Sequence, residues 1–363
     1  YLTLKSTAML RKIFFSAMGM LCLIVTHAQD SAKTETPASA ATTITGSVDV
    51  YYRFNFANAK KQLATNNFTS FTNSQNSFEL GMASLKVVHS FGKVSAVADI
   101  GFGTRAAEFS YNETGILAAV KQAYITYAPS DKVIFTMGKF ATHVGYELLD
   151  PQLNRNYSMS YMFSYGPFSH TGLKMDVAVS KNFGFMVGVA NPTDYLSASF
   201  EKKFFLAQLH AASSNGKLTA YLNYVGGKDT AKTTQNQVDW VVIGKLSDKF
   251  SIGYNGTVKA ITEDGGDSHS WWGQALYLNV DPTSKFGFTI RGEYFDDKKG
   301  AAGFGTSFFD ATFTLNIKPA DHLMIMPEYR ADFAKDPYFS KNMDNPTFKK
   351  GTGAFILAAV YSF

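Results

Sequence analysis

The sequence predicts an all-β protein, a transmembrane antiparallel up-and-down β-barrel of about 16 strands. From residue 44 to residue 363, apolar and polar residues alternate in short stretches, the pattern of strands with two unlike faces. Charged residues make up 17% and aromatic residues 15% of the chain, whereas an average soluble domain is about 25% charged. The one long apolar run, residues 13–25, is shorter than the roughly 20 residues of a membrane-spanning helix. Strands would therefore have to cross the membrane.

The segment 48–56 shows the alternation most clearly. Val48, Val50 and Tyr52 point to one side, whereas Asp49, Tyr51 and Arg53 point to the other. Segments 173–180, 286–294 and 309–318 repeat this pattern. One face of each strand suits lipid and the other suits water.

The order of turns and loops gives the predicted barrel an orientation. Short polar turns follow every even strand and longer loops follow every odd strand, as in bacterial barrels with short periplasmic turns and long extracellular loops. The predicted strands are 44–56, 77–90, 94–105, 116–128, 133–140, 170–180, 185–191, 199–213, 218–226, 235–246, 250–260, 270–281, 286–295, 307–318, 323–333 and 351–363.

A soluble β-sandwich or a lipocalin-like barrel would also show alternation, but with its apolar face inside. Alternation alone does not separate these folds from a membrane barrel. The asymmetry of the loops, the aromatic residues at the strand ends and the N-terminal segment favour the membrane.

The N-terminal segment indicates export. Arg11 and Lys12 precede the apolar run, and small residues flank a cleavage point after Ala28, so we expect a signal peptide over 1–28. Residues 1–8 would be an extension upstream of a start at Met9. Residues 29–43 would form a flexible linker, and residues 44–363 the outer-membrane barrel. The single cysteine, Cys22, lies in the signal peptide, which excludes disulfides and thiol chemistry from the mature chain.

Other chemistry is weakly indicated. The segment 101–106 matches the GxGxxA dinucleotide pattern, but no amphipathic helix is expected after it. The histidines lack metal-ligand spacing, and the acidic residues near Gly265 lack the spacing of a calcium loop. The net charge of +5 includes Lys5, Arg11 and Lys12 of the signal peptide, so no nucleic-acid surface is indicated. We expect no enzyme, metal or cofactor.

The segment 141–169 is the longest predicted loop, and it is too aromatic for a disordered segment. If it folds into the lumen, it would form a pore constriction; the alternative is an outward loop that covers the barrel mouth or a neighbouring subunit. The candidate constriction residues are Tyr146, Glu147, Asp150, Arg155, Tyr157 and Tyr161.

Charged residues on the predicted inner face carry both signs. Mixed charges in a barrel wide enough for water favour hydrated polar solutes without strong ion selectivity. The candidate pore-wall residues are Asp49, Arg53, Asp99, Arg105, Lys174, Asp176, Arg291, Glu293, Asp310, Glu328 and Arg330.

The last predicted strand carries Tyr361 and Phe363, preceded by apolar residues at alternate positions. This arrangement is similar to the signal that the barrel assembly machinery of the outer membrane reads. Any lipid-facing closing strand would also be aromatic, but a terminal Phe is more specific.

Three segments resemble a known family. They are KFATHVGYE (139–147), NYSMSYMFSYGPFSHTGLK (156–174) and VDVYYRFNF (48–56), and they resemble the OmpL-like β-barrel porins (porin-2 type) of Gram-negative outer membranes. The resemblance implies a water-filled channel for passive diffusion of small polar solutes, and it supplies no catalytic residue. The alternative is a non-conducting barrel that acts through its loops as a surface adhesin or scaffold. Outer-membrane lipids and lipopolysaccharide would surround the barrel, and a homo-oligomer is left open.

Overall fold

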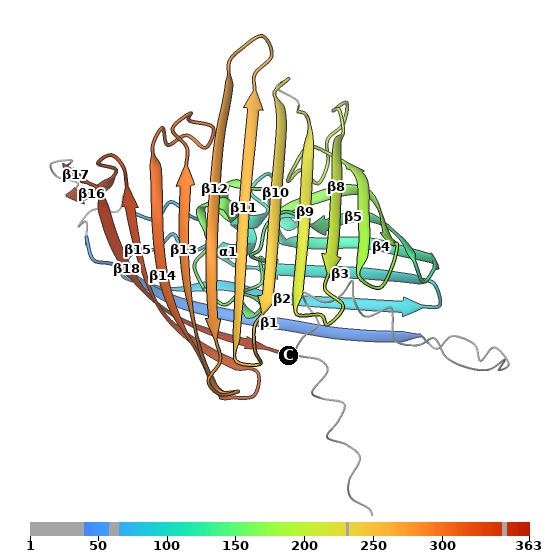
Figure 1. Cartoon of the computed structure of the whole chain (residues 1–363), viewed down its shortest axis with the longest axis horizontal. Coiled ribbons are helices and arrows are strands. Elements are labelled where there is room, and N and C mark those ends of the chain that lie inside the picture. The colour runs from blue at the N-terminus through green and yellow to red at the C-terminus, as the bar shows by residue number, and fades with distance from the viewer. Residues whose placement is uncertain (1–39, 58–64, 230–231, 343–346) are drawn as a thin grey trace, which may run out of the picture.

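A computed structural model describes residues 40–57, 65–229, 232–342 and 347–363. Sixteen antiparallel strands form one closed barrel (Figure 1). In chain order they are β1 (Ala41–Asn55), β2 (Ser77–Phe91), β3 (Val94–Phe102), β4 (Val120–Ser130), β5 (Val133–Ala141), β6 (Ser169–Ala178), β7 (Phe183–Ala190), β8 (Phe204–Ala212), β9 (Leu218–Lys228), β10 (Thr234–Lys245), β11 (Phe250–Thr262), β12 (Ser268–Val280), β13 (Phe286–Asp296), β14 (Ser307–Ala320), β15 (Leu323–Ala334) and β18 (Gly351–Ser362).

The barrel closes between its first and last strands. Val48 of β1 lies opposite Tyr361 of β18, and Phe54 lies opposite Phe355. The fold and the number of strands predicted from the sequence are therefore confirmed. A separate two-stranded sheet, β16 (Phe339–Asn342) with β17 (Thr347–Lys349), lies between β15 and β18 and was not predicted.

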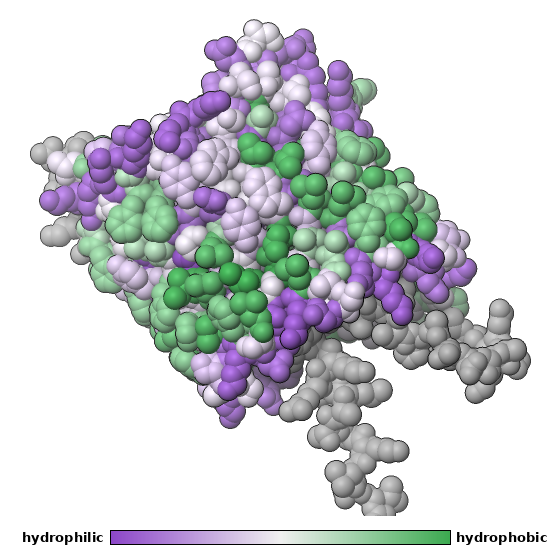
Figure 2. Space-filling model, in the orientation of Figure 1, coloured by the Kyte–Doolittle hydropathy of each residue, from purple (hydrophilic) through white to green (hydrophobic). Residues whose placement is uncertain are grey.

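The two faces of the wall are those of a membrane barrel. In β14, Asp310, Thr312 and Thr314 are buried, whereas Phe309 and Phe313 are 46% and 42% exposed. Only a lipid surround satisfies exposed apolar rows around a polar interior. The predicted inward and outward faces are confirmed, and the soluble alternatives, which need an apolar interior, are excluded. On the face shown in Figure 2, hydrophobic residues lie across the middle and hydrophilic residues lie toward the two ends.

The ends of the barrel differ, but less regularly than predicted. Turns such as Gly92–Lys93 between β2 and β3 are short, and the segments after β1, β3, β5 and β7 are long. The segments after β9 and β11 are no longer than the turns after β8 and β12. Figure 1 shows the hairpin of β11 and β12 rising at the end opposite the short turns. Among the described residues, no helix is long and apolar enough to cross a membrane.

The predicted limits of several elements were wrong. The strand predicted over 94–105 ends at Phe102, and Arg105 belongs to a short helix, α1 (Thr104–Phe109), instead of the wall. Gly103 ends the strand because its φ of 119° suits glycine, and a Cβ there would lie 2.5 Å from the carbonyl oxygen of Gly81. A helix therefore does follow the GxGxxA segment, although it has six residues.

Other strands begin later or earlier than predicted. A 3-10 helix, η2 (Gly115–Ala119), precedes β4, and β8 begins at Phe204 instead of residue 199. Residues 41–43, assigned to the linker, form the start of β1. The signal peptide and the rest of the linker lie outside the described residues.

The wall gives a first prediction. Ile290 is 43% exposed on the outer face, so Ile290→Arg should destabilise the inserted barrel by about 2 to 4 kcal/mol, the cost of a guanidinium at the lipid midplane. The matched control is His210→Arg, because His210 lies on the inner face of β8 and is partly exposed. Urea unfolding in lipid bilayers measures both variants. Greater destabilisation by His210→Arg would contradict the assignment of the faces.

Candidate functional site: the loop inside the barrel

The segment between β5 and β6 folds into the barrel and contacts its inner wall. It contains a 3-10 helix, η3 (Pro151–Leu153), and a short helix, α2 (Tyr161–Tyr165). We call residues 142–168 the inner loop. The Ser160 side chain caps α2 by accepting a hydrogen bond from the backbone N–H of Phe163, which stabilises the start of this short helix.

Acidic wall residues on β13 and β15 bind backbone N–H groups of the inner loop. Glu293 accepts hydrogen bonds from Tyr161 and Met162 at 2.7 and 2.8 Å. Glu328 accepts hydrogen bonds from Tyr157 and Ser158 at 2.8 and 3.0 Å. These N–H groups would otherwise be buried without partners, so the two carboxylates fix the path of the loop against the wall.

Two arginines on the same part of the wall, in β13 and β15, bind acceptor groups of the inner loop. Arg291 pairs with Glu147 of the loop at 2.7 Å and with Asp310 of β14 at 2.8 Å. Arg330 donates to the carbonyl oxygen of Met159 at 2.6 Å and pairs with Asp332 at 2.7 Å. Both arginines are at most 3% exposed. The wall charges predicted to face water are thus covered by the loop.

A second contact joins the loop to β1. The Tyr157 hydroxyl donates to Asp49 at 2.6 Å, and burial raises the pKa of Tyr157 well above its usual value, so it remains a donor. Gly81 makes room for this pair, because a Cβ there would overlap the Asp49 carboxylate. Arg105 of α1 is fully buried, with its guanidinium 4.8 Å from the Tyr157 ring centre.

The lower part of the loop reaches the short turn between β12 and β13. Arg155 makes two hydrogen bonds to Asp281, at 3.0 and 2.8 Å. The side chain of Arg155 is 26% exposed. Because Asp281 belongs to a turn on the periplasmic side, the loop extends from one end of the lumen to near the other.

Loop contacts also reach the opposite wall. Gly145 donates to Asp239 of β10, and Tyr146 stacks on Tyr277 of β12 with ring centres 4.2 Å apart. His143 bonds to the carbonyl oxygen of Tyr224, and burial lowers the pKa of His143 to about 4. A cavity of only about 10 Å³ remains between the loop and strands β10 and β11.

Inward charges on the β3 to β6 side are less completely covered. Lys121 bridges Asp99 of β3 and Asp150 of the loop, at 3.0 and 2.5 Å. The side chain of Asp150 is 18% exposed, and the Lys174–Asp176 pair is 20% and 10% exposed. This side of the lumen keeps charged groups in contact with solvent.

All six candidate constriction residues therefore contact the wall or a neighbouring side chain. Of the candidate wall residues, only Arg105 lies off the strands. Arg53 donates to the carbonyl oxygens of Thr65 and Ser74, in the segment after β1.

Lys121 and Asp194 contribute to the site but were not predicted from the sequence. Lys121 lies at a register shift in the pairing of β3 with β4, so strict alternation does not assign it to a face. Asp194 accepts hydrogen bonds from the N–H groups of Phe168 and Ser169 and thereby ties the end of the inner loop to the segment after β7. Nothing in the local sequence signals that contact. Among the described residues, no group of three or more potential ligands could hold a metal ion.

Solved structures share this architecture. The anion-selective porin from Comamonas acidovorans has a TM-score of 0.61 at 10% identity, over 90% of this chain and all of that chain. The outer membrane channel DcaP of Acinetobacter baumannii has a TM-score of 0.60 at 13% identity, over 92% of this chain and all of that chain. OmpT of Vibrio cholerae has a TM-score of 0.60 at 12% identity, over 91% and 99%. At these identities the likeness concerns the fold, and a comparison with curated protein sequences found no match.

A closed barrel with a polar interior and a loop bound inside it defines the porin class of outer-membrane protein. The family described as "Putative beta-barrel porin-2, OmpL-like" matches residues 41–363, and the chain belongs to that family.

Proposed function

We propose that the protein is a passive channel for small polar solutes and that the inner loop forms its constriction. The inner loop, hydrogen-bonded to both sides of the wall, is the observation that carries this proposal. Above the loop a cavity of about 540 Å³ remains on the extracellular side. Below this cavity the loop reduces the open cross-section of the lumen. The narrowest section of a pore limits both conductance and the size of the solute.

The route for solutes lies between the inner loop and strands β3 to β6. There Asp150 and Lys174 keep partial exposure, whereas Arg291 and Glu293 are buried. Near the periplasmic end the route would pass the partly exposed Arg155–Asp281 pair. Charges of both signs along this route favour hydrated solutes over ions of one sign. The channel would need no catalytic residue and no cofactor.

Conductance of the purified protein in a planar bilayer tests the proposal. We expect discrete, ohmic current steps from folded protein. Folded, inserted barrels without current would instead indicate a non-conducting adhesin or scaffold. The membrane environment would be the outer membrane, with its lipids and lipopolysaccharide around the exposed aromatic rows. One solved form of OmpT from Vibrio cholerae is a trimer, and cross-linking in native membranes would test whether this chain also assembles.

The loop charges give a second prediction. Arg155→Glu should raise the permeability of cations relative to anions, because the new carboxylate and Asp281 would both be unpaired near the periplasmic end of the lumen. Reversal potentials in a salt gradient measure this shift. The double variant Arg155→Glu with Asp281→Lys keeps the net charge and restores the ion pair, so it should return to wild-type selectivity. An unchanged potential in the single variant would place Arg155 outside the ion path.

The closing strand gives a third prediction, which rests on our proposal that Tyr361 and Phe363 are recognised by the barrel assembly machinery. The two side chains are 47% and 52% exposed on the outer face. Removing Phe363 should reduce the amount of inserted protein in cells far more than the loss of one half-exposed Phe, at most about 1.5 to 3 kcal/mol, would lower stability.

Phe348→Ala is the control, because Phe348 is 56% exposed and lies outside the barrel wall in β17. Immunoblots of outer-membrane fractions compare the two variants. Equal amounts of inserted protein would contradict a role for Phe363 in assembly.

A further inference from the structure

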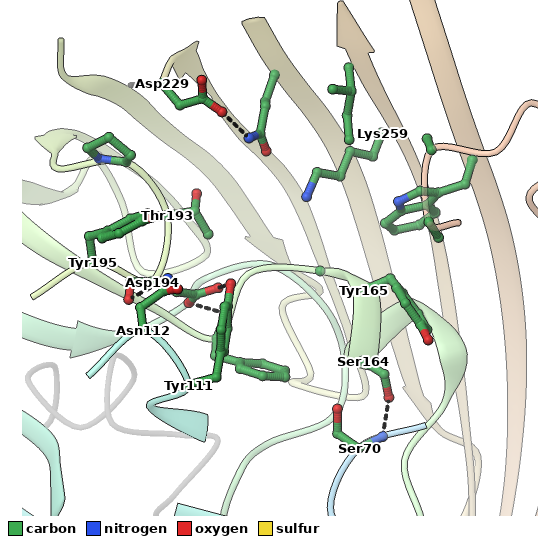
Figure 3. Close-up of a pocket in the computed structure, with 18 of the residues that line it drawn as sticks. Ser70, Tyr111, Asn112, Ser164, Tyr165, Thr193, Asp194, Tyr195, Asp229 and Lys259 are labelled. Carbon is green, nitrogen blue, oxygen red and sulfur yellow. Dashed lines mark hydrogen bonds between the residues drawn. The ribbon is translucent and has the colours of Figure 1, made fainter. Parts of the chain in front are cut away.

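A cavity lies above the inner loop, at the extracellular end of the lumen. It has a volume of about 540 Å³, within the range of small-molecule sites. Figure 3 shows its walls, which come from α1 and the segment after it, the end of the inner loop, residues 192–195, and strands β10, β11 and β12.

Three carboxylates line this cavity, and chain donors bind both oxygens of each. Asp194 accepts from the N–H groups of Phe168 and Ser169 on one oxygen and from the Tyr111 hydroxyl on the other. Glu108 accepts from Phe71 N–H and the Asn73 amide. Asp229 accepts from Thr233 N–H and the Gln235 amide.

These carboxylates keep unused acceptor capacity. An ionised carboxylate offers about four lone-pair positions. The described donors use two on Asp229 and, with the Ser70 side chain, three on Glu108. Burial raises the pKa of Asp194 to about 6, against the opposing hydrogen bonds of Ser169 and Phe168, so this carboxylate is mainly ionised at neutral pH. The rim can therefore accept further hydrogen bonds from a cation.

Of the described residues that line the cavity, Lys259 of β11 is the one with an ammonium group. Its side chain points into the space between the two sides in Figure 3. Within the described part of the chain its Nζ atom has no hydrogen bond and no ion pair, in contrast to Lys121, which binds two carboxylates. An ammonium group in a confined site is stabilised when it donates a charge-assisted hydrogen bond to an anion.

The lining also has an apolar component. Tyr165, Phe168 and Trp271 contribute to its walls. Tyr165 and Trp271 both pack against Phe295, with ring centres 5.8 and 5.1 Å from it, so their positions are fixed by the wall. Rigid aromatic walls suit a solute with a hydrocarbon portion.

From these observations we propose that the cavity binds a small zwitterion, a free amino acid or a short peptide, with its carboxylate on Lys259 and its ammonium group toward the carboxylates of the rim. A simple anion would meet three carboxylates and a single ammonium. A simple cation would leave Lys259 unpaired and add a like charge beside it. A zwitterion satisfies both signs at once. The inference rests on the proposed channel function only in that solutes enter from the extracellular side; binding itself does not require conductance.

Isothermal titration of the folded, detergent-purified barrel tests the site with three probes of similar size. These are leucine (zwitterion), leucinamide (cation) and N-acetylleucine (anion). We expect leucine to bind most tightly, and Lys259→Met to weaken leucine binding by about tenfold or more. Lys249→Met, in a short turn at the opposite end, is the control and should bind leucine as the wild type does.

Lys259→Arg should retain binding, which separates loss of charge from loss of folding. Equal binding of leucine to Lys259→Met, or tighter binding of either single-charge probe, would overturn the proposal. Leucine binding to a barrel that carries no current would refute the channel function and leave this site standing. Current without leucine binding would refute the binding site and leave the channel function standing.

Discussion

Deletion of residues 152–159 is expected to raise single-channel conductance at least about twofold while the barrel stays folded. The deleted segment carries Arg155, Tyr157 and Ser158, which bind Asp281, Asp49 and Glu328 across the lumen. Removing them would replace protein by water in the narrowest section, where pore resistance is concentrated. None of these residues belongs to a barrel strand, so the interstrand hydrogen bonds remain.

The wall should tolerate this deletion because water would replace the loop. Asp49 and Glu328 would lose their loop donors, but in an open lumen they would be hydrated and would not remain as buried, unpaired charges. Heat modifiability on electrophoresis checks folding, and planar bilayer recordings measure conductance. A folded variant with wild-type conductance would place the limiting section elsewhere, on the wall near Arg53 or in the segment after β1.

The barrel could be predicted from the sequence because alternate residues of a strand face opposite sides of the wall, one toward lipid and one toward the lumen. In β13, Thr289, Arg291 and Glu293 are buried, whereas Ile290 is exposed. In an extended chain, the face to which one side chain points fixes the faces of its neighbours. Where the ladder shifts register, as beside Asp99 in β3, the rule fails, and Lys121 was missed for that reason.

The path of the inner loop could not be predicted in the same way. Its polar side chains would be satisfied by water outside the barrel or by the charged wall inside it, so composition favours neither. The choice depends on partners far away in the chain, such as Glu147 with Arg291 and Tyr157 with Asp49. Arg105 shows the same limitation, since its place in α1 beside Tyr157 depends on contacts with the loop.

The largest effect on stability is expected from Arg291→Met. Arg291 is fully buried and holds Glu147 at 2.7 Å and Asp310 at 2.8 Å. It also donates to the carbonyl oxygen of Ser158 at 2.7 Å. Removing this cation leaves buried Glu147 without a cation and leaves Asp310 with only Arg330, 3.6 Å away. Breaking a buried pair in this way costs about 3 to 5 kcal/mol.

This cost should appear as release of the inner loop before the barrel unfolds. Glu147 lies on the loop and Asp310 on the wall, so the unpaired Glu147 carboxylate can move away from Asp310 and become hydrated only if the loop leaves the wall. We therefore expect Arg291→Met to show larger and fluctuating single-channel currents, and loop cleavage by protease, at temperatures where the barrel still migrates as folded protein. Arg291→Met combined with Glu147→Gln removes the unpaired charge of Glu147 and should recover part of the loss. Steady wild-type currents in the single variant would show that the hydrogen bonds of Glu293 and Glu328 hold the loop without Arg291.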